Sequence, residues 1–367
     1  MPELRPSERP ARILHAPWNV GGNPYGLSRG ERELGFHSDV MVFRAHEFGY
    51  REDIDLGVGT DDTWESRRKR LRFLLWALRR YDVFHFNFGY TIMTSFGEDR
   101  VYSELPLLRR LGKTILATFQ GDDARPPADN PWGPQQPSYL EWAARYQHWK
   151  RGLLVKYSHR CFFLNPDLRR YLPGAEFRPY ANIDPWAITP SPVPDREKVV
   201  VAHAPSHRGI KGTDHVIAAV DGLRAEGLPI ELDLIEGVSN EEALARVVAA
   251  DLAVDQLNIG WYGGFAVECM ALGRPVVSHI REDSPEDNPF GNELPIVRAD
   301  PASVRDRLRD LVADRERLRE LGRRGREFVE RAHDPREVAR RNLEGLVAMP
   351  DSAARPDRAS RAAAAGA

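Results

Sequence analysis

Short apolar runs alternate with longer amphipathic segments along most of the chain. The short runs have strand character, and ten strands are expected at Ala11–Pro17, Ser38–Phe43, Asp82–Phe88, Lys113–Phe119, Arg160–Leu164, Glu176–Tyr180, Lys198–Ala204, Ile230–Ile235, Leu252–Gln256 and Pro275–Ile280. Helical patterns fill the intervals at Gly26–Leu34, Thr63–Arg80, Val101–Leu111, Ser138–Tyr157, Thr213–Glu226, Asn240–Ala250 and Gly264–Leu272. This alternation predicts an α/β fold in which helices cover parallel sheets.

One proline-rich segment interrupts the alternation. Residues 181–197 (ANIDPWAITPSPVPDRE) contain four prolines and no periodic pattern, which is typical of an interdomain linker. We therefore expect two Rossmann-like, doubly wound domains that face a cleft, at residues 1–180 and 198–349, the second ending in charged helices. The Ala- and Arg-rich residues 350–367 are expected to be disordered.

The composition of the chain argues against several classes of protein. The 367 residues include 52 basic and 54 acidic side chains, and this near-neutral balance argues against a nucleic-acid partner. Cys161 and Cys269 lie inside apolar runs and are expected to be buried thiols without a disulfide. No apolar stretch is long enough for a signal peptide or a membrane span, so a cytoplasmic location is expected.

Three loops that follow expected strands have the composition of anion-binding loops. The first contains Gly21, Gly22 and Asn23, directly after the first strand. Paired glycines allow a ligand to approach the backbone and leave N–H groups at a helix start. The spacing is not the GxGxxG of a dinucleotide-binding loop, and a simple tight turn is the alternative.

The second loop, HAPSHRGIKGT, carries Arg208 and Lys211 after the first strand of the second domain. Thr213 or its neighbour is placed to cap the next helix, whose N-terminus has a partial positive charge. Two cations beside such a helix start suit a diphosphate. Ordinary solvated charges on a surface loop are the alternative.

The third loop, GWYGGFAVE, runs from a strand end into a helix. Gly263 and Gly264 can present backbone N–H groups to an anion, and Phe265 follows them. Glu268 lies among apolar neighbours and needs a hydrogen-bonding partner there. A pair of sugar hydroxyls is one candidate, and a structural bond to the backbone is the other.

Taken in order, HAPSHRGIKGTDHVI and GWYGGFAVECMALGRPVVSHI resemble the second domain of GT-B glycosyltransferases, in particular the retaining glycosyltransferase family 4 (group 1). The resemblance covers residues 198–345 well and the first domain more weakly. It implies a glycosyltransferase that moves a sugar from a nucleotide-sugar donor with retention and needs neither metal nor cofactor. The second domain would bind the donor and the first domain the acceptor.

The resemblance also implies roles for individual residues. Arg208 and Lys211 match cations that bind the donor diphosphate, and Glu268 matches an acid that contacts the ribose. The loop whose N–H groups face the phosphates and the sugar is matched by Gly263, Gly264 and Phe265. The first-domain loop near phosphate and acceptor is matched by Gly21 and Gly22, with Asn23 next to them.

Two positions depart from the family pattern. Gly260 stands eight residues before Glu268, where the family has a second glutamate that touches the sugar. Gln120 stands where a sugar-contacting histidine is often found, and Asp122 and Asp123 after it either bond sugar hydroxyls or cap the next segment. These three are the candidate catalytic residues. A non-catalytic carbohydrate- or nucleotide-binding relative and a sugar-nucleotide epimerase therefore remain alternatives.

The acceptor is not specified by these motifs and could be a small molecule, a saccharide or a lipid-linked group. No Asp-x-Asp pair follows an expected strand, and no His/Cys cluster has metal-ligand spacing, so no metal site is expected. Residues 67–80 (RRKRLRFLLWALRR) combine basic ends with an apolar middle. This segment is expected to be a helix packed on the first sheet, with contact to an anionic membrane surface as the alternative.

Overall fold

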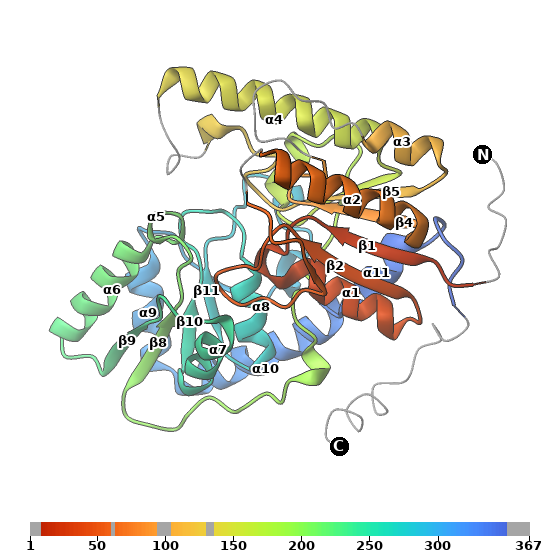
Figure 1. Ribbon diagram of the computed structural model, residues 1–367. Coiled ribbons are helices and arrows are strands. Elements are labelled where there is room, and N and C mark those ends of the chain that lie inside the picture. The colour runs from red at the N-terminus through yellow and green to blue at the C-terminus, as the bar shows by residue number, and fades with distance from the viewer. Residues whose placement is uncertain (1–8, 60–62, 94–103, 130–135, 351–367) are drawn as a thin grey trace. The chain divides into compact units, whose positions relative to one another are not determined.

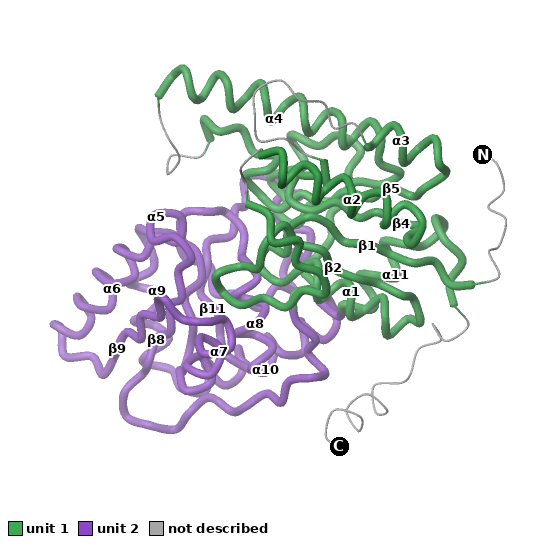
Figure 2. Tube along the Cα trace, viewed as in Figure 1, with its two compact units in different colours: residues 1–182, 335–355 green, residues 183–334, 356–367 purple. Residues whose placement is uncertain are grey.

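The computed structural model describes residues 9–59, 63–93, 104–129 and 136–350. The elements of the chain are labelled in Figure 1, and Figure 2 shows the two compact units into which it divides. Unit 1 comprises residues 1–182 and 335–355, and unit 2 comprises residues 183–334 and 356–367. Among the described residues, no helix has the length and apolar character needed to cross a membrane.

Unit 1 is built on a seven-stranded, fully parallel sheet in the order β3-β2-β1-β4-β5-β6-β7. Its strands are β1 (Arg12–Ala16), β2 (His37–Val42), β3 (Ile54–Asp55), β4 (Val83–Asn87), β5 (Thr114–Phe119), β6 (Arg160–Phe163) and β7 (Glu176–Phe177). Its α-helices are α1 (Asn23–Glu33), α2 (Trp64–Arg80), α3 (Glu104–Arg110), α4 (Pro137–Tyr157) and α11 (Pro335–Leu343). The six expected strands are present; β3 was not expected, because two residues carry no periodicity.

Both faces of this sheet are buried, as parallel sheets require. Alternate residues of each strand enter different clusters. Leu14 and Phe84 pack with residues of α2, α3 and α4, whereas Ile13 and Val83 pack with residues of α11 and of the turn that follows α1. On the second face a Cβ added to Gly30 of α1 would lie 2.4 Å from the carbonyl oxygen of Pro335. A glycine is therefore needed where α1 and α11 cross.

The position of α11 changes the expected domain boundaries. Residues 335–349 were expected in the second domain but belong to unit 1, because α11 packs on α1. Residues 183–197 of the expected linker belong to unit 2. Residues 351–367 of the expected disordered tail lie outside the described residues.

Unit 2 is built on a five-stranded parallel sheet in the order β12-β11-β10-β8-β9. Its strands are β8 (Val199–His203), β9 (Ile230–Leu234), β10 (Leu252–Val254), β11 (Val276–Ser278) and β12 (Val297–Arg298). Its α-helices are α5 (Arg208–Lys211), α6 (Thr213–Ala225), α7 (Asn240–Ala249), α8 (Gly264–Ala271), α9 (Val304–Ala313) and α10 (Arg315–Ala332). The four expected strands are present, and the two-residue β12 is additional.

Each sheet has one topological switch point. In unit 2 the chain goes from β8 to β9 on one side and then to β10 on the other side of β8. In unit 1 it goes from β1 to β2 and β3 and then returns to β4 on the other side of β1. Ligands of doubly wound sheets bind outside the carboxyl ends of the strands at such points, so the loops after β8, β10, β1 and β4 are where a site is expected.

Candidate functional site

The loop after β8 leads into the short helix α5 and then into α6. The His207 side chain caps α5 by accepting a hydrogen bond from the Ile210 N–H. Gly212 separates the two helices with φ of 74°, and a Cβ there would lie 3.0 Å from Cβ of Leu257. Thr213 was one candidate for the cap of α6, but its hydroxyl instead lies 2.9 Å from Nε2 of the buried His203. Glycine thus allows α5 to lie against the loop that follows β10.

Lys211 at the end of α5 meets the loops after β10 at the switch point. Its ammonium donates to Oδ1 of Asp255 at 2.6 Å and to Oε1 of Gln256 at 3.0 Å. The other carboxylate oxygen of Asp255 accepts the N–H of Gly263 at 2.6 Å. A Cβ on Gly263 would lie 3.2 Å from the lysine nitrogen, so the glycine lets the cation reach the start of α8.

Asp255 and Gln256 were not among the expected site residues. Both are polar residues at the carboxyl end of an expected strand, which is the signal that could have identified them. The Asp255 side chain is fully buried, and its two oxygens connect a cation to a helix N-terminus. A buried carboxylate needs such partners, because desolvation of an unpaired charge costs several kcal/mol, roughly, per ion.

Arg208 lies at the other end of α5 and has a different partner. Its guanidinium makes two hydrogen bonds to the carboxylate of Glu236, at 2.8 and 2.5 Å. These bonds raise the pKa of Arg208 and lower the pKa of Glu236. The arginine is half exposed, so the two expected diphosphate cations come from one helix but are held by different acids.

Glu268 lies in α8 and is buried, as its apolar neighbours led us to expect. The side-chain amide of Asn240, at the start of α7, is 3.3 and 3.4 Å from its two oxygens. Gly264 and Phe265 form the first turn of α8 and are half-buried. A Cβ added to Gly260 would lie 2.7 Å from Cβ of Arg281, so a glutamate there would require Arg281 to move.

In unit 1 the three candidate catalytic residues follow β5 but are held differently. Asp123 is buried and accepts the N–H groups of Gln120 and Gly121 at 2.9 and 2.7 Å. Both N–H groups belong to residues that precede Asp123, so these bonds do not cap the next segment. Asp122 is half exposed and pairs with Arg125 at 3.2 Å. The Gln120 side chain is buried, and its Nε2 has no hydrogen-bond partner among the described residues.

Lys150 of α4 lies next to Asp123 and was not expected as a site residue. Burial raises the pKa of Asp123 to about 6 and lowers the pKa of Lys150 to about 8. The lysine nitrogen lies 3.7 Å from the ring centroid of Tyr90, which follows β4. A Cβ on Gly89 would lie 3.0 Å from Cβ of Asp123, so the loops after β4 and β5 meet closely here.

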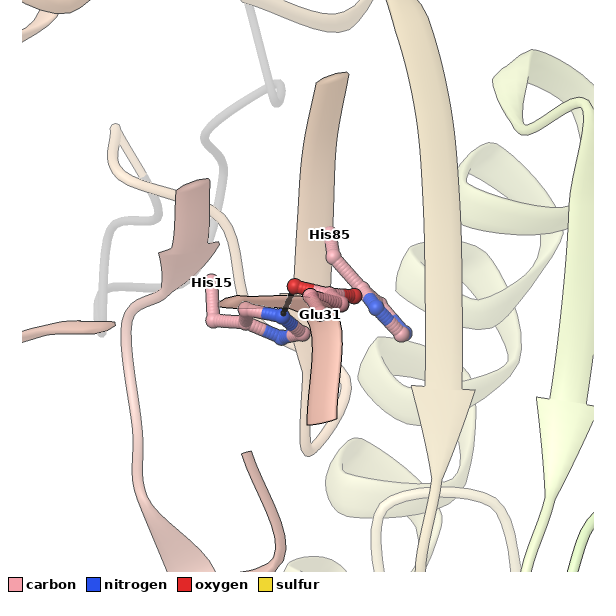
Figure 3. A group of neighbouring side chains, drawn as sticks. All are labelled: His15, Glu31 and His85. Atoms are coloured by element: carbon pink, nitrogen blue, oxygen red, sulfur yellow. Dashed lines mark hydrogen bonds and ion pairs between the residues drawn. The ribbon is translucent and has the colours of Figure 1, made fainter. Parts of the chain in front are cut away.

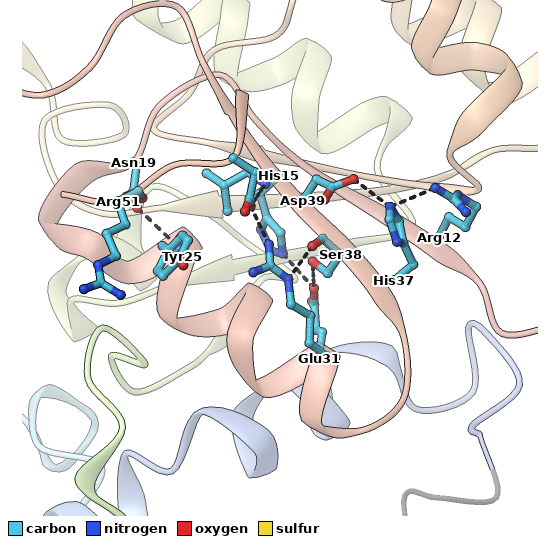
Figure 4. A network of polar contacts seen from close by, with 12 residues as sticks. Arg12, His15, Asn19, Tyr25, Glu31, His37, Ser38, Asp39 and Arg51 are labelled. Carbon is cyan, nitrogen blue, oxygen red and sulfur yellow. Dashed lines mark hydrogen bonds and ion pairs between the residues drawn. The ribbon is translucent and has the colours of Figure 1, made fainter. Parts of the chain in front are cut away.

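The Gly21–Gly22 loop has the conformation that its glycines permit. Their φ values are 61° and 70°, and Gly22 precedes the first residue of α1. Asn19 holds the loop by donating to the carbonyl of Arg51 at 2.8 Å and accepting the N–H of Tyr25 at 3.2 Å (Figure 4). The Asn23 side chain accepts the N–H of Ala181 at 2.7 Å.

No protein-family model and no curated protein matches the chain. Solved structures match nearly its whole length. Sucrose-phosphate synthase from Thermosynechococcus elongatus has a TM-score of 0.61 at 15% identity, covering 91% of this chain and 97% of that one. The Anabaena protein HepE in complex with UDP-glucose has a TM-score of 0.60 at 10% identity, covering 92% and 99%. A putative UDP-N-acetylglucosamine 2-epimerase from Listeria monocytogenes has a TM-score of 0.51 at 13% identity, covering 91% and 95%.

At these identities the likeness establishes the fold and not the activity. The expected fold class is confirmed: the chain has the GT-B fold, with two Rossmann-like α/β units. The switch points of its two sheets are the places where that fold would hold a ligand.

Proposed function

We propose that the protein is a glycosyltransferase that takes its sugar from a nucleotide-sugar donor held by unit 2. The observation that supports this most strongly is the meeting of Lys211 with the N-terminus of α8 at the switch point of the sheet. A similar solved structure, that of HepE, contains UDP-glucose. Positive charge and backbone N–H groups at one place suit the diphosphate of such a donor.

The lysine has capacity for a ligand. An ammonium group has three donors, and the described residues supply two acceptors for that of Lys211, the side chains of Asp255 and Gln256. A phosphate oxygen would take the third. As the glycosidic bond breaks, the departing nucleoside diphosphate gains negative charge, and a cation and helix N–H groups already in place lower the barrier.

The other candidate residues have narrower roles in this proposal. Glu268 would accept hydrogen bonds from the ribose hydroxyls in place of those from Asn240. Arg208 would exchange Glu236 for a phosphate oxygen. Gly21 and Gly22 would border the phosphate and the acceptor, while Gln120, Asp122 and Asp123 would contact the sugar. Retention and independence of metal and cofactor are proposed from the resemblance to glycosyltransferase family 4.

Removal of both cations tests the donor site. In the Arg208→Ala/Lys211→Ala variant, we expect the affinity for UDP-glucose and other nucleotide sugars to fall by orders of magnitude, together with turnover. Binding is measured by the rise in melting temperature that a true donor produces through ligand linkage. Lys198→Ala is the matched control, because Lys198 is an exposed lysine of the same unit, beside the opposite end of β8. Equal binding and turnover in the double variant would refute the proposed site.

The epimerase alternative is supported by the fold likeness to the Listeria 2-epimerase. The two activities differ in what happens without an acceptor. An epimerase inverts one sugar carbon of its nucleotide sugar. A transferase leaves the nucleotide sugar unchanged or slowly hydrolyses it to free sugar and nucleoside diphosphate. NMR spectra of nucleotide sugars incubated with the protein distinguish them. Tight binding with no reaction, even when acceptors are supplied, would indicate a non-catalytic relative.

We also propose that the outer face of α2 contacts anionic lipid surfaces. The helix packs on its sheet through Phe73, Leu74 and Ala77, in agreement with the expected packed helix. Four large apolar side chains of the same helix nevertheless remain exposed, Trp64, Leu71, Leu75 and Trp76. Two of them, Leu75 and Trp76, line a hollow of about 560 Å³ together with five arginines, Arg9, Arg12, Arg72, Arg79 and Arg80.

This combination suits a membrane interface, because arginines attract anionic headgroups while tryptophan and leucine enter the acyl boundary. Co-sedimentation with vesicles containing an anionic lipid should show binding at low salt that high salt weakens. The Leu75→Ser/Trp76→Ser variant should lose most of it. Leu107→Ser, at another exposed leucine of unit 1, should not. If the wild-type protein does not bind these vesicles at low salt, the proposed lipid contact is excluded. Nothing would then support an acceptor located in the membrane.

A further inference from the structure

Three titratable side chains form a group inside the core of unit 1 (Figure 3). His15 and His85 occupy paired positions on the neighbouring strands β1 and β4, and Glu31 comes from α1. The centroids of the two imidazole rings are 4.7 Å apart, and the Glu31 carboxylate contacts the His15 ring. All three side chains are buried, with exposed fractions of 0 to 1%.

The hydrogen bonds of this group use only part of its polar atoms. Oε2 of Glu31 lies 2.9 Å from Nε2 of His15 and accepts the Ser38 hydroxyl at 2.6 Å. Nε2 of His85 lies 2.7 Å from the Thr118 hydroxyl. Each of the three residues keeps one buried atom without a hydrogen-bond partner among the described residues: Nδ1 of His15, Oε1 of Glu31 and Nδ1 of His85.

The Ser28 hydroxyl, one turn before Glu31 on α1, is a fourth buried polar atom for which the described part of the chain offers no partner. Buried polar groups are nearly always satisfied, by protein, by water or by an ion. Four such atoms on two paired strand positions and one turn of α1 therefore call for an occupant.

We propose that His15, Glu31 and His85 bind a divalent transition-metal ion, for which zinc is the best match. Two imidazoles and one carboxylate form a ligand set that zinc commonly takes in proteins. One ligand atom from each residue can be chosen so that all lie within 4.8 Å of one another. Bonds of about 2.1 Å in a tetrahedral site place ligand atoms roughly 3.4 Å apart, so side-chain movements of about an ångström complete the site.

The surroundings already contain groups that would orient these ligands. Ser38 donates to the Glu31 carboxylate, and the Thr118 hydroxyl lies 2.7 Å from Nε2 of His85. Hydrogen bonds of this kind fix the rotamer and tautomer of metal ligands. The fourth position would be filled by water or by the Ser28 hydroxyl. Since Glu31 belongs to the helix that follows the Gly21–Gly22 loop, the ion would anchor that helix to the sheet.

Metal analysis of the full chain, purified without chelators, tests this proposal. We expect about one zinc ion per chain in the wild type and at least a tenfold loss in His85→Gln and in Glu31→Gln. His37→Gln is the matched control: His37 lies in the same sheet, 2.7 Å from the Asp39 carboxylate (Figure 4). Its metal content should equal that of the wild type.

The wild type alone provides an independent test, in case a variant fails to fold. Crystals measured at the zinc edge should show an anomalous peak between the three side chains. Extraction with EDTA should lower the melting temperature. Less than a tenth of an ion per chain after refolding with zinc, or water without anomalous signal at this position, would overturn the proposal. Zinc that remains bound to the His85→Gln variant would also overturn the proposal.

Discussion

Each unit contains a lysine and an aspartate beside a glycine in a loop that follows a strand, and the two pairs differ in geometry. In unit 2 the ammonium of Lys211 touches Asp255 at 2.6 Å, and the same carboxylate accepts the Gly263 N–H. In unit 1 the carboxylate of Asp123 is occupied by two backbone N–H groups, while Lys150 lies over the ring of Tyr90. The first pair is in direct contact, and the second interacts through charge alone.

The pair in unit 1 has shifted pKa values, because its two charges are buried without direct contact. Asp123 and Lys150 are desolvated and compensate each other incompletely, so their pKa values move toward neutrality, to about 6 and about 8. Such groups can exchange protons near neutral pH. In unit 2, by contrast, the ammonium of Lys211 lies in direct contact with the Asp255 carboxylate at the start of α8.

Breaking the contact pair should have the largest effect on stability. Asp255→Asn leaves the Lys211 ammonium without its carboxylate, and loss of one partner of a buried pair typically costs about 3–5 kcal/mol. The free energy of unfolding, from urea denaturation, should fall by that amount. Glu231→Gln, which removes the partner of the exposed Lys198, should leave it unchanged. A similarly small effect of Asp255→Asn would mean that the contact contributes nothing.

The shifted pKa of Asp123 should make the free energy of unfolding depend on pH. The pKa of Asp123 is about 6 in the folded chain against an ordinary 3.8, so the folded state holds this proton more tightly. Its stabilising contribution is complete below pH 3.8 and is lost as the pH rises through 6, a change of about 3 kcal/mol at 1.36 kcal/mol per unit. Lys150 stays protonated in both states over this range.

Asp123→Asn should remove that part of the slope, as measured by urea midpoints between pH 4 and pH 7. Asp122→Asn is the control, because Asp122 is half exposed and pairs with Arg125 at the surface. If both variants keep the wild-type slope, Asp123 does not titrate in this range.

Substitution of Arg208 should have the smallest effect on the free energy of unfolding. This exposed arginine pairs with Glu236, and surface pairs contribute little to folding. Arg208→Ala should therefore leave the urea midpoint unchanged while it weakens UDP-glucose binding by about tenfold, the equivalent of one charge-assisted hydrogen bond. Unchanged binding, measured by calorimetry, would assign the diphosphate to Lys211 alone.

Local patterns were enough for most of the architecture. All ten strands expected from the sequence pattern are present in the structure, and paired glycines occur in loops at both switch points. The strands β3 and β12 were missed because two residues cannot show a period. The burial of Glu268 also followed from its apolar neighbours alone.

The order of elements, the two α/β sheets and the chemistry of single loops could be predicted from the sequence, because these depend on neighbours within a few residues. Which charges meet could not be predicted, because the partners come from distant segments. Lys211 contacts Asp255 across 44 positions, and α11 returns to unit 1 through a crossing that Gly30 permits. His15, Glu31 and His85 come together because strand register and helix packing place them there. Such contacts depend on three-dimensional packing, which no local period encodes.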